Sequence, residues 1–167
     1  MAPRAVFVGA PGAGKSTIGA AVARLLGVPF ADADAIIEVE AGKPIPEIFI
    51  DDGEEAFRAL ERSVIATALE SYDGVLALGG GAILDAGTRE LLRKQTVVYL
   101  SVELSDAVKR VGLGAGRPLL AINPRATLKY LLDQRRPLYA EVATHTIKTD
   151  GREPDDIATE AAALLQR

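Results

Sequence analysis

The sequence of 167 residues predicts a three-layer α/β/α fold, in which helices cover both faces of a five-stranded parallel sheet. Short apolar segments alternate along the chain with stretches of helical periodicity. These segments are almost continuously apolar, as strands buried on both faces are. Glycines or acidic residues follow three of them, and ligands bind at the carboxyl ends of strands in such folds. The sequence therefore predicts both the fold class and the edge of the sheet that carries function.

The first strand is expected over residues 4–8, because a short apolar run there ends at Gly9. A helix follows over residues 15–26. Its apolar residues recur with a helical period, and Gly27 stops it. Strand, glycine-rich turn and helix thus succeed one another without a linker.

The middle of the chain continues the alternation. A second strand over 28–31 ends at an acidic pair, and a third over 74–78 runs into three glycines. Between them, residues 45–69 are expected to form a helix in two pieces, because the Asp-Asp-Gly sequence at 51–53 interrupts the helical pattern. The remaining elements are expected as strands at 96–100 and 144–149, the latter weaker, and as helices at about 85–94, 104–111, 124–140 and 154–166.

Composition limits the classes of function. Hydrophobic residues make up 49% and charged residues 25%, which is typical of one globular domain spanning residues 1–167. The absence of cysteine excludes thiolate catalysis and Cys-based metal sites, and it fits a cytoplasmic protein. A net charge of −4 provides no basic field for nucleic acid or an anionic membrane, and the apolar run at 5–10 is too short to span a bilayer. We expect a cytoplasmic monomer that binds neither.

The strongest motif is G-x-x-x-x-G-K-[ST], which runs from Gly9 to Ser16 between a predicted strand and a predicted helix. Glycines let backbone N–H groups approach phosphate oxygens, and the helix N-terminus adds positive charge. Lys15 would reach the β- and γ-phosphates, and the Ser16 hydroxyl would bind Mg²⁺. The alternative is a glycine-rich turn without a ligand. The context favours a site for ATP and Mg²⁺.

Asp32 and Asp34 lie at the end of the second predicted strand. A carboxylate at this position can hold magnesium through water or accept the proton of an attacking hydroxyl. It can equally cap the N-terminus of a helix, where aspartate is favoured. The pair alone leaves both possibilities open, and its place beside the phosphate loop favours function.

Five motifs in this order resemble the shikimate kinases over essentially the whole chain: D-x-D at 32–34, G-E-x-x-F-R at 53–58, L-G-G-G at 78–81, R-P-L-L at 117–120 and R-x-P-L-Y at 135–139. The resemblance implies a P-loop NTPase fold like that of the nucleoside monophosphate kinases. It also implies a shikimate-binding lobe at about 33–61, a mobile lid at about 112–124, and transfer of the ATP γ-phosphate to the 3-hydroxyl of shikimate.

The resemblance also implies roles for individual residues. Asp34 would hold the acceptor hydroxyl and act as general base, while Arg58 and Arg136 would clamp the shikimate carboxylate with their planar guanidinium groups. Gly79, Gly80 and Gly81 would let the backbone approach the substrate, with Gly80 and Gly81 donating N–H groups. Asp32 would help Ser16 to hold magnesium, through water.

On the nucleotide side, Lys15 and Arg117, the latter on the lid, would neutralise charge on the transferred group, so Lys15, Asp34 and Arg117 are the expected catalytic residues. The expected nucleotide-binding residues are Gly12, Ala13, Gly14, Lys15, Ser16, Thr17, Arg110, Arg117, Arg152 and Pro154.

Two positions depart from the family pattern. Ala33 and Ala77 stand where hydroxyl side chains are expected, near the magnesium and its waters. The remaining alternatives are a gluconate or nucleoside monophosphate kinase of the same fold, and a nucleotide-binding switch without catalysis. His145, the single histidine, has no His or Cys partner for a metal site.

Overall fold

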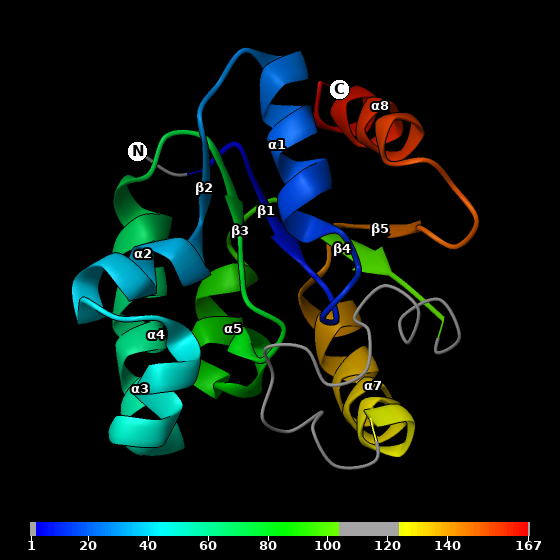
Figure 1. Cartoon of the computed structure of the whole chain (residues 1–167). Coiled ribbons are helices and arrows are strands. Elements are labelled where there is room, and N and C mark those ends of the chain that lie inside the picture. Colours follow the sequence, from blue (N-terminus) through cyan, green and yellow to red (C-terminus); the bar gives the residue numbers. More distant parts are fainter. Residues whose placement is uncertain (1–2, 104–123, 167) are drawn as a thin grey trace.

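The structure is a computed structural model that describes residues 3–103 and 124–166, and it confirms the predicted fold class (Figure 1). Five strands form one sheet in the order β2-β3-β1-β4-β5, and every neighbouring pair is parallel. The strands are β1 (Ala5–Val8), β2 (Phe30–Asp32), β3 (Val75–Ala77), β4 (Val97–Ser101) and β5 (His145–Lys148).

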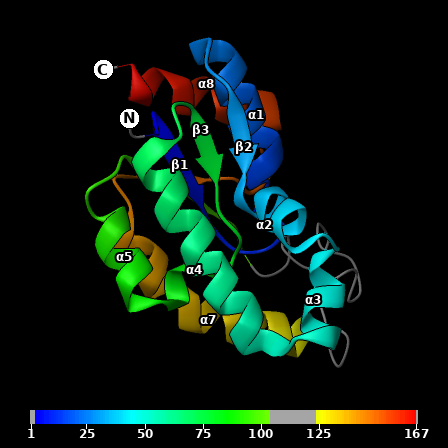
Figure 2. The ribbon, with the colours of Figure 1, turned by 90° about the vertical axis from the view of Figure 1, so that its left-hand side faces the viewer.

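Helices cover both faces of this sheet. They are α1 (Lys15–Leu26), α2 (Ala33–Ala41), α3 (Ile45–Asp51), α4 (Gly53–Ser71), α5 (Ala86–Leu92), α7 (Pro124–Val142) and α8 (Pro154–Leu165), with a short 3₁₀ helix η1 (Ala82–Leu84). Helices α1 and α8 lie on one face, and α4, α5 and α7 lie on the other (Figures 1 and 2).

Strand β1 shows how the core is divided between the two faces. Ala5 and Phe7 join an apolar cluster with residues of α1 and α8. Val6 and Val8 join a second cluster with residues of α4, α5 and α7. All four side chains are buried, so β1 is the apolar strand with two covered faces that the sequence predicted.

A third apolar cluster is separate from these two. It contains Ile37 of α2, Ile48 of α3, and Phe57 and Val64 of α4. Helices α2 and α3 lie beyond the end of β2, where they pack against α4 (Figure 2). Helices α2 and α4 also contribute Ala33 and Ile65 to the second cluster, so this small core is anchored to the sheet through them.

Most predicted boundaries agree with the structure to within a few residues. The break at 51–53 is confirmed, because α3 ends at Asp51 and α4 begins at Gly53. Helix α2 was not predicted, and α7 continues past Pro137 to Val142. The helix expected at 104–111 lies outside the described residues. Within the described part of the chain, no helix is long and apolar enough to cross a membrane.

Candidate active site

The phosphate loop leaves β1 and enters α1 at the carboxyl edge of the sheet. Gly9 is required there by close approach, since an added Cβ would lie 2.6 Å from the Leu100 carbonyl oxygen. Gly14 precedes α1 with φ of 93°, a left-handed conformation that glycine adopts without strain. The helix has no side-chain cap and no acidic residue in its first turn, so its positive end remains available to an anion.

Lys15 is held by the loop itself. Its Nζ donates to the carbonyl oxygens of Gly9 at 2.7 Å and Ala10 at 3.1 Å. The ammonium group therefore lies against the backbone of the phosphate loop. A phosphate that entered the loop would replace these two carbonyl oxygens as its partner.

Asp32 joins the phosphate loop to α2. Its Oδ1 accepts a hydrogen bond from the Asp34 backbone N–H at 2.9 Å, which caps the N-terminus of α2. Its Oδ2 accepts a hydrogen bond from the Ser16 hydroxyl. The capping alternative is thus correct for Asp32, and the same carboxylate also lies against the loop residue expected to bind magnesium.

The Ser16 and Asp32 oxygens fit a hard divalent cation, which prefers oxygen ligands and retains several waters. No group of three or more His, Cys, Asp or Glu side chains with metal-binding geometry occurs in the described ranges. A cation here would therefore take its other ligands from phosphate and water. Ala33 and Ala77 are both buried, and Ala77 pairs with Asp32 in the β2–β3 register, so methyl groups lie around this position.

Side chains from two helices, α2 and α4, come together at the triple glycine after β3. A Cβ added to Gly79 would lie 2.7 Å from Asp34 Oδ1 and 3.4 Å from Glu61 Oε2, and one added to Gly81 would lie 2.5 Å from Arg58 Nη2. The glycines are needed because these side chains occupy the space of a Cβ. The structure thus brings Asp34, Arg58 and the glycine turn together, as the sequence predicted.

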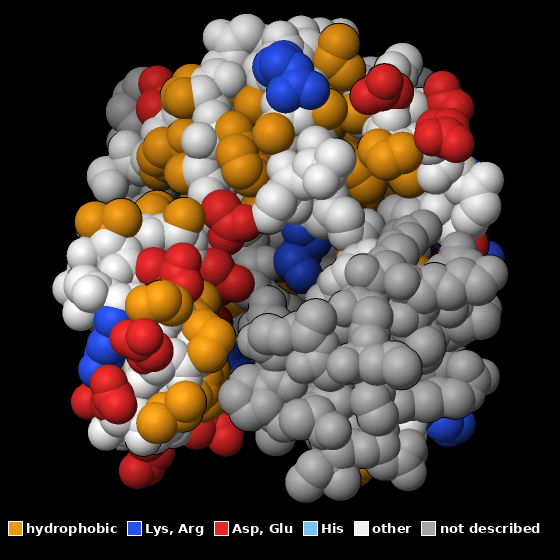
Figure 3. Space-filling view, viewed as in Figure 1, with side chains coloured by type: hydrophobic (Ala, Val, Ile, Leu, Met, Phe, Trp, Pro, Cys, Tyr) orange, Lys and Arg blue, Asp and Glu red, His pale blue; other side chains and the backbone are white. Residues whose placement is uncertain are grey.

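The same turn touches the phosphate loop. A Cβ added to Gly80 would lie 2.8 Å from Pro11 Cδ. The phosphate loop and the glycine turn are therefore in van der Waals contact. Charged side chains of both signs gather at the centre of this face of the molecule (Figure 3).

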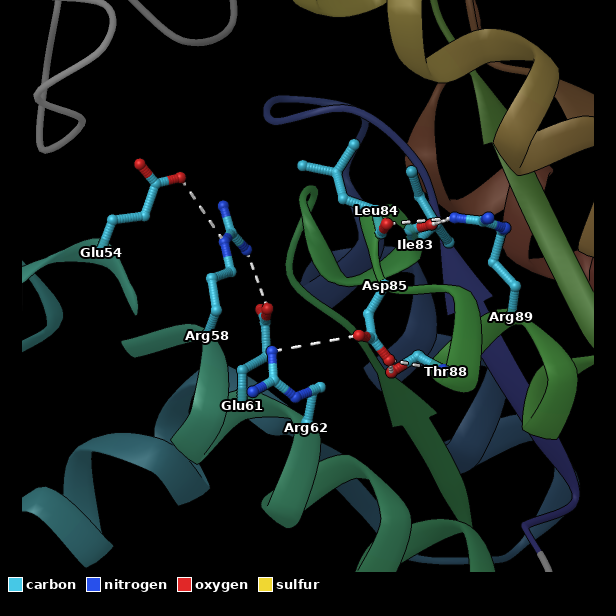
Figure 4. A network of polar contacts seen from close by, with 9 residues as sticks. All are labelled: Glu54, Arg58, Glu61, Arg62, Ile83, Leu84, Asp85, Thr88 and Arg89. Carbon is cyan, nitrogen blue, oxygen red and sulfur yellow. Dashed lines mark hydrogen bonds and ion pairs between the residues drawn. The ribbon is translucent and has the colours of Figure 1, made fainter. Parts of the chain in front are cut away.

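Glu61 was not predicted as a site residue, although it lies three positions after Arg58 on α4. Its carboxylate accepts from Arg58 Nη1 at 2.8 Å, and Glu54 Oε1 lies 3.8 Å from Arg58 Nε (Figure 4). Burial raises the pKa of the Glu61 carboxyl, the positive charge of Arg58 opposes that rise, and the negative charge of Asp34 adds to it. The positive charge of Arg135 also acts to lower this pKa.

This pKa shift predicts a pH effect on stability. The folded state holds a proton on Glu61 more readily than the unfolded chain, whose carboxyl has an ordinary pKa of 4.5. The contribution of Glu61 to the free energy of unfolding is therefore fully present below that pH and is lost as the pH rises through the raised pKa. Relative to Glu61→Gln, the wild type should therefore lose stability as the pH rises above the ordinary carboxyl pKa of 4.5.

Urea denaturation of both proteins across this range measures the effect. Glu54→Gln is the matched control, because Glu54 also contacts Arg58 but its side chain is 57% exposed. Its stability should run parallel to that of the wild type. A Glu61→Gln curve parallel to the wild type would contradict the shift.

The two arginines of the R-x-P-L-Y motif lie in different surroundings. Arg135 is buried, with 6% of its surface exposed. The Arg136 side chain is 38% exposed, its Nη2 donates to the Val102 carbonyl at 3.4 Å, and it lies 3.9 Å from Glu103 Oε2. The sequence pointed to Arg136 as the partner of Arg58. In the structure it is Arg135 whose charge acts on the Glu61 cluster.

Side chains also hold the segment that follows the glycines. Arg89 Nη1 donates to the carbonyl oxygens of Ile83 at 2.7 Å and Leu84 at 3.1 Å (Figure 4). Its Nε lies 3.2 Å from Glu141 Oε2 of α7. Asp85 caps α5 through the Thr88 backbone N–H. Of these contacts, the one between Arg89 and Glu141 joins residues far apart in the sequence, and no motif indicated it.

The remaining predicted residues belong to the nucleotide side. Arg152 donates to Glu160 Oε1 at 2.7 Å and to the Lys148 carbonyl at 3.1 Å, and Pro154 begins α8. Both follow β5 at the carboxyl edge of the sheet. Arg110 and Arg117 lie outside the described residues, as does most of the expected lid. His145 begins β5 and is partly exposed.

Comparison with known proteins gives one consistent family. Residues 11–166 match the family model described as shikimate kinase. A shikimate kinase of Salinispora tropica is 67% identical over 165 residues, covering 99% of each chain, and one of Streptomyces avermitilis is 55% identical, covering 98% of this chain and 96% of its own.

Solved structures of shikimate kinases are also similar to this chain. A shikimate kinase from Acinetobacter baumannii in complex with shikimate is 40% identical, with a TM-score of 0.94, covering 99% of this chain and 93% of its own. A gluconokinase from Sinorhizobium meliloti is 24% identical with a TM-score of 0.60, covering 98% of this chain and 91% of its own, which shows a shared fold alone.

Proposed function

The chain belongs to the shikimate kinase family, and from this premise we propose which of its residues transfer the γ-phosphate of ATP to the 3-hydroxyl of shikimate. The reaction gives shikimate 3-phosphate and ADP. The observation that carries the assignment of residues is the contact between the phosphate loop and a glycine turn on which Asp34, Arg58 and Glu61 converge. The family excludes the alternative functions that the sequence left open. These were a gluconate or nucleoside monophosphate kinase and a nucleotide-binding switch without catalysis.

On the donor side, Lys15 and the N-terminus of α1 hold the β- and γ-phosphates, and the Lys15 ammonium exchanges its bonds to Gly9 and Ala10 for phosphate oxygens. Ser16 and, through water, Asp32 would hold Mg²⁺, and the hydrogen bond between the two side chains supports this assignment. When bound, Mg²⁺ neutralises part of the charge on the phosphates. The nucleotide is also held by Gly12, Ala13, Gly14, Thr17, Arg152 and Pro154, and by Arg110 and Arg117 from the part of the chain outside the described residues.

On the acceptor side, Asp34 orients the 3-hydroxyl and accepts its proton as the oxygen attacks the γ-phosphorus. This role is supported by the position of its Oδ1 beside Gly79, at the turn that touches the phosphate loop. The protein forms no covalent intermediate in such a transfer, so its contribution is the alignment of hydroxyl and phosphate and the balance of charge around them. Arg117 would supply a further positive charge.

We propose that Arg58 and Arg135, rather than Arg58 and Arg136, clamp the shikimate carboxylate. Glu61 accepts from Arg58 Nη1 and Glu54 lies against Arg58 Nε, so Arg58 Nη2, which lies beside Gly81, is the group that would bind the substrate. Arg135 is supported as the second partner by its burial and by its charge at Glu61. Arg136 is engaged instead with the end of β4.

The two adjacent arginines allow a direct test. Arg135→Ala should weaken shikimate binding by roughly one to two orders of magnitude, the size expected for loss of a hydrogen bond to a charged group. Arg136→Ala is the matched control and should stay within about threefold of the wild type. Calorimetric titration with shikimate measures both, and binding of an ATP analogue should change in neither.

A shikimate analogue with its carboxylate reduced to an alcohol shows whether Arg135 acts through that carboxylate. The wild type should bind it poorly, and Arg135→Ala should cost little further affinity for it, because the interaction is already absent. A larger loss of shikimate binding in Arg136→Ala than in Arg135→Ala would restore the assignment to Arg136.

We also propose that the third apolar cluster forms the core of a shikimate-binding lobe at about 33–61, and that a lid at about 112–124 carries Arg117. A cytoplasmic monomer that binds neither nucleic acid nor membrane is consistent with the absence of cysteine and the net charge of −4.

A further inference from the structure

Tyr139 of α7 is hydrogen-bonded to the glycine turn that lies between the phosphate loop and the charged cluster. It is among the largest fully buried side chains of the described residues, with 1% of its surface exposed. Its hydroxyl donates to the Gly80 carbonyl oxygen at 2.5 Å, and its ring stacks on Tyr99 of β4 with a centroid distance of 5.1 Å. The ring contact and the burial leave the hydroxyl little freedom to turn elsewhere.

The Gly80 backbone is held from two sides. Pro11 lies where a Cβ of Gly80 would be, and Tyr139 holds its carbonyl oxygen. The turn is therefore fixed between the phosphate loop and α7. A shift of the Gly80 carbonyl would move the acceptor turn relative to the loop that carries the donor.

The hydrogen bond also sets the direction of the next amide. In a trans peptide unit the carbonyl and the N–H point in opposite directions. The Gly80 carbonyl points toward α7, so the N–H of Gly81 points away from α7. An added Cβ on Gly81 would lie 2.5 Å from Arg58 Nη2, which places this residue beside the carboxylate clamp.

We propose that Tyr139 is a positioning residue, which holds the Gly80–Gly81 peptide so that the Gly81 N–H faces the acceptor. The inference rests on the proposed function, because it assigns that N–H to shikimate. Without the hydroxyl, the buried Gly80 carbonyl loses its partner and the peptide is free to rotate toward another donor. Rotation would turn the Gly81 N–H away from the substrate and leave the phosphate loop unchanged.

Tyr139→Phe tests the proposal, with Tyr99→Phe as the matched control. Both changes remove one hydroxyl from the same stacked pair of rings, and only the first breaks the bond to Gly80. Tyr139→Phe should raise the Kd for shikimate about tenfold while the Kd for an ATP analogue stays within about twofold. Tyr99→Phe should change neither value by more than about twofold.

Three results would overturn the inference. They are equal shikimate affinity in Tyr139→Phe and Tyr99→Phe, equal losses for shikimate and the ATP analogue in Tyr139→Phe, and an unshifted Gly81 amide in the wild type. The Gly81 amide signal of the wild type is followed by nuclear magnetic resonance during a shikimate titration. This measurement tests the inference even if Tyr139→Phe does not fold. The amide should shift with shikimate and not with ADP alone. If the wild type bound no shikimate at all, the proposed function itself would fail.

Discussion

Substitution of Lys15 by Met is expected to abolish nearly all turnover of shikimate in a protein that still folds. Methionine keeps the length and the apolar stem of lysine but removes the charge that the phosphate loop holds over its own carbonyls. That charge faces the phosphates as negative charge redistributes during transfer, so its loss raises the barrier for the chemical step. Release of ADP in a coupled assay measures the turnover.

Lys129→Met serves as the matched control. Lys129 lies on α7 with its side chain 64% exposed and pairs with Asp133 at 2.7 Å. Loss of an exposed pair of this kind costs about 0–1 kcal/mol, so its turnover should match that of the wild type. A Lys15→Met enzyme whose turnover stays within about tenfold of the wild type would contradict the assignment of the phosphate loop.

Asp34→Asn is expected to lower kcat by about 10²–10⁴-fold, the range typical of a general base. The amide keeps the shape of the carboxylate against Gly79 but accepts a proton poorly. Shikimate binding should fall much less than kcat, because the amide can still hydrogen-bond the hydroxyl. Initial rates at saturating ATP and a range of shikimate concentrations separate the two effects.

Asp32→Asn tests the division of roles between the two aspartates. Asp32 caps α2 and binds the Ser16 hydroxyl, so its variant should require a higher concentration of Mg²⁺ for the same rate. If Asp32→Asn were the more damaging change at saturating Mg²⁺ and Asp34→Asn nearly silent, the assignment of the base to Asp34 would be reversed.

The phosphate loop and the sheet could be predicted from the sequence because their signals are local. A buried strand, a glycine-rich turn and a helix follow one another within Ala5–Leu26, and the same logic applies to β3 and its glycines. Helix α2 was missed because it has nine residues, its Val39 is 82% exposed, and the aspartate that caps it was also a candidate ligand.

Contacts across the chain were harder to predict. Glu61 follows Arg58 by three residues on α4, so a pair on one helix face could have been expected. The bond from Tyr139 to Gly80 spans 59 positions and depends on how α7 packs against the sheet. The same packing decides between Arg135 and Arg136, because adjacent residues on a helix point in directions about 100° apart.

The most direct test of the central claim is the acceptor-stimulated release of ADP. The purified protein is supplied with ATP and Mg²⁺ and offered shikimate, gluconate, AMP or CMP in separate reactions. Shikimate should accelerate ADP release far above the rate without acceptor, and the other three should leave it near that rate. Stimulation by gluconate or a nucleotide with none by shikimate would contradict the account.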